Sequence, residues 1–195
     1  MKIILAVLSL LLVLFVGNSQ STKEHVEGLF NKAYATLDTY PDSSYYYADM
    51  ALSISEGKGL EWHQAKAKYI LGYVYKQKGQ FSKSIILYLE AISILERLDD
   101  QKSNKDHVKI IVNCGNILKN HYKFKDAHQF YDRALELAIK IGFNSQILKI
   151  HFNKSMAYGM EERFDLSVDE ALICHELSVG FDDERMRIKT WNRLG

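Results

Sequence analysis

The sequence predicts an all-α fold built as a solenoid of antiparallel helix pairs, and three observations lead to this prediction. Apolar residues recur at the spacing of amphipathic helices along most of residues 21–195. No segment of useful length alternates between apolar and polar residues, and the chain holds one proline, so we expect no strands. Small and aromatic residues recur with a period near 40 residues, which is typical of stacked repeats.

The repeat consists of a small residue, an aromatic residue nine positions later and a second small residue nineteen positions later. It starts at Gly72, Gly115 and Ser155, which are 43 and 40 positions apart, and a fourth copy starts 40 positions after Ser155. Small residues on both helices of a pair allow a close crossing, and we expect the aromatic residue to begin the second helix and fill the wedge beside it. The predicted packing positions are Leu71, Gly72, Tyr75, Phe81, Tyr88, Ala91, Gly115, Phe124, Ala127, Tyr131, Ala134, Ser155, Phe164, Cys174, Trp191, Leu194 and Gly195.

Residues 1–19 are predicted to form a secretory signal peptide. Lys2 precedes an apolar run over residues 3–16, and small residues suited to cleavage follow at 17–19. As a helix the run would span about 21 Å, which is shorter than the ~30 Å hydrocarbon core of a bilayer. A cleaved signal is therefore favoured over a permanent anchor, and we expect an exported protein in the periplasm or cell envelope of a bacterium.

The helix pairs are expected to follow one another along the chain. Residues 20–59 form a degenerate first pair, in which Ser21 and Glu24 fit a capping box and Pro41 separates the two helices. Gly79, Gly142 and Gly180 are expected to close later helices. The solenoid proper covers residues 60–195, with helices expected at 42–55, 60–78, 82–98, 106–121, 125–141, 145–161 and 165–178, and repeats near 60–104, 105–143, 144–181 and, in part, 182–195.

Composition and motifs exclude several classes of function. The formal net charge is +1 and the charged residues are spread along the chain, which argues against a nucleic-acid partner. Cys114 and Cys174 occupy repeat positions that otherwise hold leucine or alanine, so buried core thiols are favoured over a disulfide. None of the seven histidines has metal-binding or catalytic spacing. We expect no metal, no cofactor and no enzyme activity in this segment.

The repeat residues resemble the tetratricopeptide repeat (TPR) family over about residues 28–195. The resemblance implies a right-handed α-solenoid. The third repeat departs from the family pattern, with Lys154 in place of leucine, Ser155 in place of glycine, Ala171 in place of an aromatic residue and Cys174 in place of alanine. The residues that carry the match are Leu71, Gly72, Tyr75, Gly79, Phe81, Tyr88 and Ala91, then Gly115, Phe124, Ala127, Tyr131 and Ala134, and finally Trp191, Leu194 and Gly195.

The resemblance implies that the first helix of each pair lines a concave groove that binds a protein or peptide. Four lysines, each six positions before the small residue, form a recurring ladder, which is either a row of solvated lysines or a contact line for an acidic peptide. The candidate groove residues are Tyr69, Tyr73, Lys76, Val112, Asn116, Lys119, Phe152, Met156 and Gly159, and the ladder is Lys66, Lys109, Lys149 and Lys189.

The lengthened period behind a signal peptide resembles the exported sensor region of bacterial TPR-containing histidine kinases and related regulators. The alternatives are a free-standing periplasmic adaptor in envelope assembly and the non-catalytic part of an enzyme whose active site lies beyond residue 195. The fourth repeat stops within its first helix, so we expect a fragment whose only membrane contact lies in a further C-terminal region. Its uncapped apolar end, with Trp191 and Leu194, would favour self-association or disorder.

Overall fold

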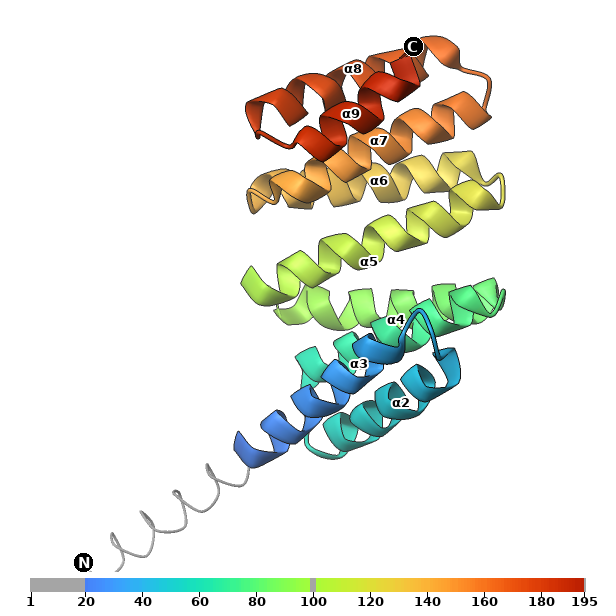
Figure 1. The fold of residues 1–195 in the computed structure, drawn as a ribbon. Coiled ribbons are helices and arrows are strands. Elements are labelled where there is room, and N and C mark those ends of the chain that lie inside the picture. Colours follow the sequence, from blue (N-terminus) through green and yellow to red (C-terminus); the bar gives the residue numbers. More distant parts are fainter. Residues whose placement is uncertain (1–19, 99–100, 195) are drawn as a thin grey trace, which may run out of the picture. The chain divides into compact units, whose positions relative to one another are not determined.

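The computed structural model describes residues 20–98 and 101–194, and the side chains of residues 20–98 and 103–193. Over these residues the chain forms nine helices and no strand, which confirms the predicted all-α fold (Figure 1). The predicted signal peptide, the side chain of Leu194 and Gly195 lie outside the described residues. No helix within residues 20–98 or 101–194 has the length and hydrophobicity that a membrane crossing requires.

The helices fall into two compact units. The N-terminal unit holds the helix of residues 20–36, α2 (Pro41–Gly57) and α3 (Glu61–Gln77). The division lies between Gln80 and Phe81, inside the repeat predicted near residues 60–104. The C-terminal unit holds α4 (Phe81–Leu98), α5 (Gln101–Asn120), α6 (Phe124–Lys140), α7 (Asn144–Met160), α8 (Phe164–Gly180) and α9 (Glu184–Leu194).

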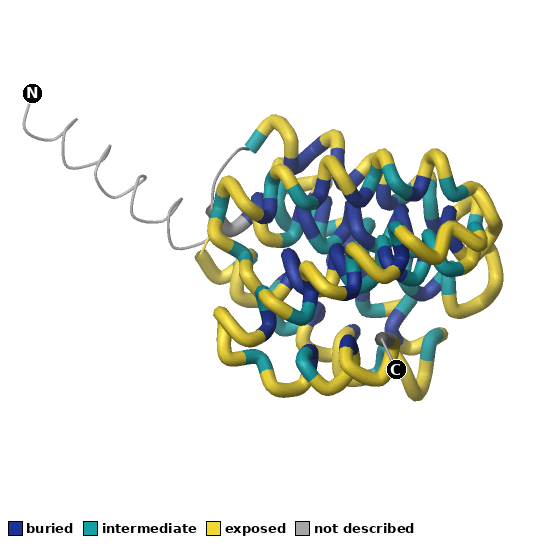
Figure 2. Tube along the Cα trace, turned by 90° about the horizontal axis from the view of Figure 1, so that it is seen from above, coloured by how far each residue is buried: buried dark blue, intermediate teal, exposed yellow. Residues whose placement is uncertain are grey.

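Helices that follow one another in sequence pack together: in the N-terminal unit α2 packs against α3. In the C-terminal unit this holds from α4 through α9, and α5 also contacts α7. Figure 2 shows buried and exposed residues alternating along the helices, so each helix turns one face toward its neighbours. The first helices of successive pairs, α5 and α7, are therefore adjacent, as the predicted stacking of repeats requires.

Most predicted helix boundaries lie within one or two residues of those in the structure, and the start of α5 differs most. Helix α5 begins at Gln101, five residues before the predicted start at Asp106, so the repeat boundary near residue 104 falls inside a helix. The polar stretch over residues 101–105 has no apolar periodicity, although Ser103 and Asn104 are buried. Helix α2 begins at Pro41 itself, because the first position of a helix needs no backbone N–H donor.

Six helices end in the same turn. Two positions after the last helical residue the backbone has a positive φ, and the next residue donates its N–H to the carbonyl five positions earlier, at 2.8–2.9 Å. Glycine supplies the positive φ at Gly59, Gly79 and Gly142, but Tyr122, Glu162 and Asp182 supply it in the other three turns. A left-handed residue other than glycine costs about 1–2 kcal/mol.

The expected closing role of Gly180 is wrong. Gly180 is the last residue of α8, and the left-handed residue of that turn is Asp182. Asp183 then donates its N–H to the Ser178 carbonyl at 2.8 Å and accepts a hydrogen bond from the Met186 N–H at 2.9 Å through its Oδ1. The carboxylate satisfies one of the free amides at the start of α9, so this junction needs no glycine.

Helices α5 and α6 approach each other closely at Gly115. A Cβ atom at this position would lie 2.6 Å from Cε1 of Tyr131, which is closer than real Cβ atoms come to another heavy atom. The Tyr131 ring is buried, and its hydroxyl donates to Asn116 Oδ1 at 2.8 Å. Burial raises the pKa of Tyr131 above its usual value. The predicted pairing of a small residue with a recurring ring is therefore a direct contact in this pair.

The aromatic residues that begin the second helices are not fully buried. Phe81 and Phe124 are half-buried, and the Phe81 ring meets His121 with ring centres 4.3 Å apart. Phe164 is 65% exposed, so the expectation that it fills a wedge is wrong. The remaining packing positions are buried at Leu71, Gly72, Tyr88, Ala91, Gly115, Ala127, Tyr131, Ala134, Ser155 and Cys174, half-buried at Tyr75 and exposed at Trp191.

Candidate binding surface

The predicted groove residues lie on the first helices of the pairs, and the structure divides them between the two units. Those of the N-terminal unit are half-buried on α3. Because α5 and α7 contact each other, the residues on these two helices contribute to one surface of the C-terminal unit. The groups are Lys66, Tyr69, Tyr73 and Lys76 on α3, Lys109, Val112, Asn116 and Lys119 on α5, Lys149, Phe152, Met156 and Gly159 on α7, and Lys189 on α9.

Within the C-terminal unit the candidate residues differ in what they offer a ligand. Val112 is buried, and Phe152 packs against the core cluster of Leu148, Cys174 and Met186. Asn116 and Met156, in contrast, are half-buried on the adjacent helices α5 and α7. Asn116 is held in place by the Tyr131 hydroxyl. An amide and a polarisable thioether therefore reach the surface at equivalent positions of two repeats.

The four lysines of the ladder have different surroundings. Lys66 Nζ lies 4.5 Å from the centre of the Phe30 ring, 4.7 Å from that of Trp62 and 3.0 Å from Glu27 Oε2. Lys109 pairs with Asp106 one turn away on its own helix, at 3.1 Å. The other two, Lys149 and Lys189, are exposed, with no ion pair to any described residue. The ladder is therefore not a uniform row, since its first lysine is held by aromatic rings and a carboxylate.

A second lysine on α3 lies in an aromatic and polar setting. Lys76 Nζ is 4.0 Å from the centre of the Tyr73 ring. The Tyr73 hydroxyl donates to Asp38 Oδ1 at 3.4 Å, and the Gln77 amide donates to the same oxygen at 3.1 Å. Burial lowers the pKa of Lys76, and Asp38 offsets part of that effect. Burial and the Asp38 carboxylate both raise the pKa of Tyr73. These contacts within the N-terminal unit hold the side chains at the C-terminal end of α3.

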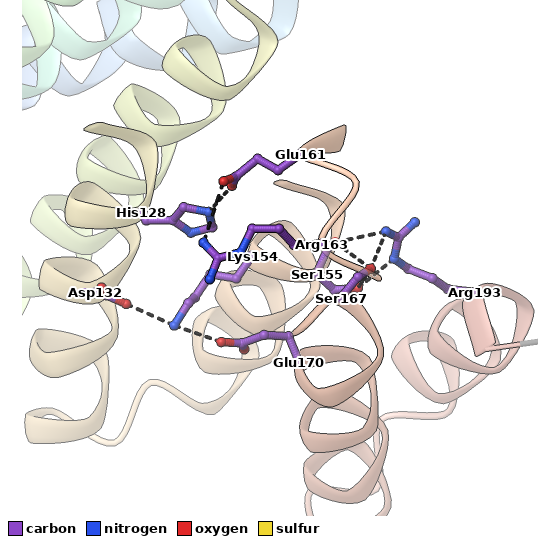
Figure 3. A network of polar contacts seen from close by, with 9 residues as sticks. All are labelled: His128, Asp132, Lys154, Ser155, Glu161, Arg163, Ser167, Glu170 and Arg193. Atoms are coloured by element: carbon purple, nitrogen blue, oxygen red, sulfur yellow. Dashed lines mark hydrogen bonds and ion pairs between the residues drawn. The ribbon is translucent and has the colours of Figure 1, made fainter. Parts of the chain in front are cut away.

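Lys154, which occupies a leucine position of the repeat, joins three helices (Figure 3). Its Nζ lies 2.9 Å from Asp132 Oδ1 of α6 and 2.8 Å from Glu170 Oε1 of α8. The other oxygen of Glu170 lies 2.7 Å from His151 Nδ1. Lys154 and Glu170 are each only 12% exposed, so the pair is largely removed from solvent. A charged network replaces the apolar contact that leucine would make here.

The pKa values of this network shift in favour of the charged pair. Burial alone would raise the pKa of Glu170, but hydrogen bonds with His151 and Lys154 outweigh it and hold that pKa below its usual value. Burial alone would lower the pKa of Lys154, but its pairing with Glu170 and Asp132 raises that pKa instead. Both groups are therefore charged at neutral pH and bind α7 to α6 and α8.

Arg193 of α9 binds the third repeat beside the position where the aromatic residue of the pattern is missing. Ala171 stands where Tyr131 stands in the α5–α6 pair. Arg193 donates from Nε to Ser155 Oγ at 2.6 Å, and from Nη2 to the Ser155 carbonyl and to Ser167 Oγ, both at 2.9 Å. Ser167 also donates to the Ser155 carbonyl at 2.9 Å. Figure 3 shows Arg193 reaching from α9 to Ser155 and Ser167, so polar contacts are made at the repeat position where Gly115 meets the Tyr131 ring in the α5–α6 pair.

His128 joins α6 to the turn after α7. Its ring stacks on Tyr158 with centres 4.1 Å apart, and its Nε2 lies within hydrogen-bond distance of Glu161 Oε1. Arg163 Nη1 lies 3.8 Å from the other oxygen of Glu161. The contact fixes the start of the turn in which Glu162 takes its left-handed conformation.

The cysteines and histidines show no arrangement for chemistry within the described residues. Cys114 and Cys174 are buried free thiols, and Cys174 Sγ donates to the Leu148 carbonyl at 3.2 Å. Burial raises the pKa of Cys114 to about 12 and that of Cys174 to about 11, so both thiols stay protonated at neutral pH. Among residues 20–98 and 101–194, no group of three histidine, cysteine or acidic residues is placed to hold a metal ion.

The charged network yields a prediction about pH-dependent stability. Because the pKa of Glu170 is lower in the folded chain than its usual 4.5, its contribution is complete above that value and is lost as the pH falls through the folded-state pKa. We expect Glu170→Gln to lower the free energy of unfolding by roughly 1–3 kcal/mol at pH 7 and by much less at pH 3. Urea denaturation at both pH values measures the difference.

Asp132→Asn is the matched control, because the Asp132 side chain is 63% exposed and contributes less to the same lysine. A loss on Glu170→Gln that is equal at pH 7 and pH 3 would contradict the assigned pairing.

Comparisons with known proteins identify structures that are similar to this fold. No protein-family model matches the sequence, and a search of curated proteins finds no significant match. Aspartyl phosphate phosphatase F from Bacillus subtilis is similar in structure, with a TM-score of 0.79 and 14% identity, over 86% of this chain and 43% of that protein. This chain therefore spans less than half the length of that protein.

Two further structures share the arrangement. One is a putative kinesin light chain from Podosopora anserina with nearly identical TPR-like repeats (TM-score 0.71, 10% identity, 87% of this chain and 83% of that one). The other is the Rap conjugation gene regulator of plasmid pLS20 in complex with the Phr* peptide (TM-score 0.65, 15% identity, 90% and 53%). Together with the stacked helix pairs described above, these similarities show that the chain has a TPR-like α-solenoid fold.

Proposed function

We propose that this chain is a scaffold that binds a peptide or protein through the first helices of its pairs. The observation that carries the proposal is the surface of α5 and α7, where Asn116 and Met156 are half-buried at equivalent positions of adjacent repeats. Recognition helices need accessible side chains, and both residues are accessible, while Asn116 is also held by the Tyr131 hydroxyl. A structural neighbour of this chain, the Rap regulator of pLS20, is a complex with a peptide, which supports the same kind of ligand here.

The chain supplies recognition rather than chemistry in this proposal. Its two cysteines are protonated and buried, and the charged side chains of the Lys154 network pair with one another between helices. The activity named for the Bacillus subtilis neighbour belongs to a protein of which this chain covers only 43%, and it is not transferred to this chain.

The cellular role that we propose is the exported sensory part of a bacterial signal-transduction protein. The apolar run at residues 3–16 and the resemblance to exported TPR sensor regions support it. Export has a direct test, in which residues 1–25 are fused to a reporter phosphatase that is active only after it leaves the cytoplasm. We expect activity from the fusion, and none when Leu8 and Leu11 are both replaced by arginine. An inactive wild-type fusion would contradict export.

Peptide binding is tested by selecting ligands from a random peptide library with the full chain as bait. We expect Met156→Ser to weaken the selected peptides by about threefold to thirtyfold, since a contact residue of an interface contributes about 1–2 kcal/mol. Fluorescence anisotropy with labelled peptides measures the affinity.

Ile139→Ser is the matched control, because Ile139 is 59% exposed on α6, the second helix of its pair. A library that yields no binder would contradict the proposed function. Peptides that respond to Ile139→Ser and not to Met156→Ser would place the binding surface on the second helices instead.

A further inference from the structure

We propose that two copies of this chain associate through α8 and α9, with α8 of each copy packing on α9 of the other. The arrangement is an isologous dimer, in which the same surface is used by both copies. The inference goes beyond the proposed peptide binding and does not depend on it. Its basis is an exposed apolar surface on these two helices, beside which the charges of α8 and α9 have opposite signs.

Helix α9 exposes two large apolar residues at positions that are buried in the preceding pair. Ile188 is 54% exposed and Trp191 is 66% exposed. The equivalent residues of α7, 40 positions earlier, are Leu148 and His151, and both are buried. Leu148 packs in a cluster with Cys174, so the second helix of that pair covers this face of the first. Among residues 20–98 and 101–194 no helix covers the same face of α9, which therefore has room for a helix from outside the described chain.

Helix α8 exposes an apolar stripe of its own. Phe164, Val168 and Leu172 recur every four residues, so they lie along one face of the helix, and all three are exposed. The residues of α6 that are equivalent to the last two are His128 and Asp132, and both of these contact α7. The stripe on α8 is thus apolar at positions where the preceding second helix makes polar contacts with its neighbour.

The apolar faces of α8 and α9 meet at a hollow of about 290 Å³. The ring of His175 on α8 lies with its centre 5.8 Å from that of Trp191, and its Nδ1 lies 3.2 Å from Thr190 Oγ1. The two faces therefore form one surface, and the hollow offers space for an apolar side chain of a second copy. Its lining residues are His175, Arg187, Ile188, Trp191 and Asn192.

The charges beside these faces identify the occupant. Helix α8 holds four acidic residues and no lysine or arginine, whereas α9 holds four basic residues and one acidic residue. Asp165, Asp169 and Glu176 of α8 are exposed and pair with no described residue, and the same is true of Arg185 and Lys189 of α9. When α8 of one copy lies on α9 of the other, acidic side chains face basic ones in both halves of the interface. Pairing of like helices would instead bring like charges together.

The test measures the mass of the full chain in solution by sedimentation equilibrium at increasing protein concentration. We expect one chain to convert to two with no larger species, because an isologous contact closes on itself. A chain that stays monomeric at every concentration overturns the proposal, and this is the result expected if another segment of the chain or a different protein covers the surface. Growth beyond two copies also overturns it, since that indicates a head-to-tail contact.

Charge exchange tests the pairing of α8 with α9. One double variant, Asp169→Lys with Glu176→Lys, reverses exposed charges of α8. The other, Arg185→Glu with Lys189→Glu, reverses exposed charges of α9. We expect each double variant alone to be monomeric where the unaltered chain is dimeric, because like charges then meet in both halves of the interface. An equimolar mixture is expected to form mixed dimers, which neither a folding defect nor association through residues 3–16 would produce. Dimers of either double variant alone, or a mixture that stays monomeric, overturn the proposal.

A further variant tests the apolar contact without changing any charge. We expect Trp191→Ser to weaken the dimer by about tenfold or more, since a tryptophan at the centre of an interface contributes much of the binding energy. Ile86→Ser is the matched control, because Ile86 is also exposed but lies on α4, and it should leave the dissociation constant unchanged. Equal effects of the two variants would contradict the assigned surface.

Discussion

The close crossing of a helix pair is the constraint on which the rest of this structure depends. In the α5–α6 pair Gly115 leaves room for the Tyr131 ring, whose hydroxyl in turn holds Asn116. Filling that space keeps α6 close to α5 and so sets where α7 can pack, since α7 contacts both helices. The positions of the surface residues on α5 and α7 follow from this contact rather than from any interaction of their own.

The α7–α8 pair meets the same constraint with polar groups. Alanine replaces the ring, and the guanidinium of Arg193 enters from the next helix to bind Ser155 and Ser167. Lysine replaces leucine, and its charge is balanced from α6 and α8. These substitutions bring charged groups into contacts that the repeat pattern makes with apolar residues.

The sequence predicts the helices and their pairing well. The apolar periodicity that marks a helix and the small residue that marks a helix pair both lie within a single repeat, so they can be recognised there. The sequence does not predict the left-handed turn residues Tyr122, Glu162 and Asp182, since the turn is imposed by the helices on either side and tolerates residues other than glycine. The sequence also does not predict that Arg193 binds Ser155 and Ser167. The departures at Ala171 and Lys154 signalled that the third repeat differs, but which distant side chain fills the space depends on packing between repeats.

The most direct test of the central constraint compares two glycine substitutions in the C-terminal unit by chemical denaturation. Gly115→Ala is predicted to lower the free energy of unfolding by roughly 1–3 kcal/mol, because the added methyl group meets the buried Tyr131 ring. Gly180→Ala has open space around it and is predicted to be neutral or to stabilise by up to about 1 kcal/mol. A Gly115→Ala variant as stable as Gly180→Ala would contradict the account.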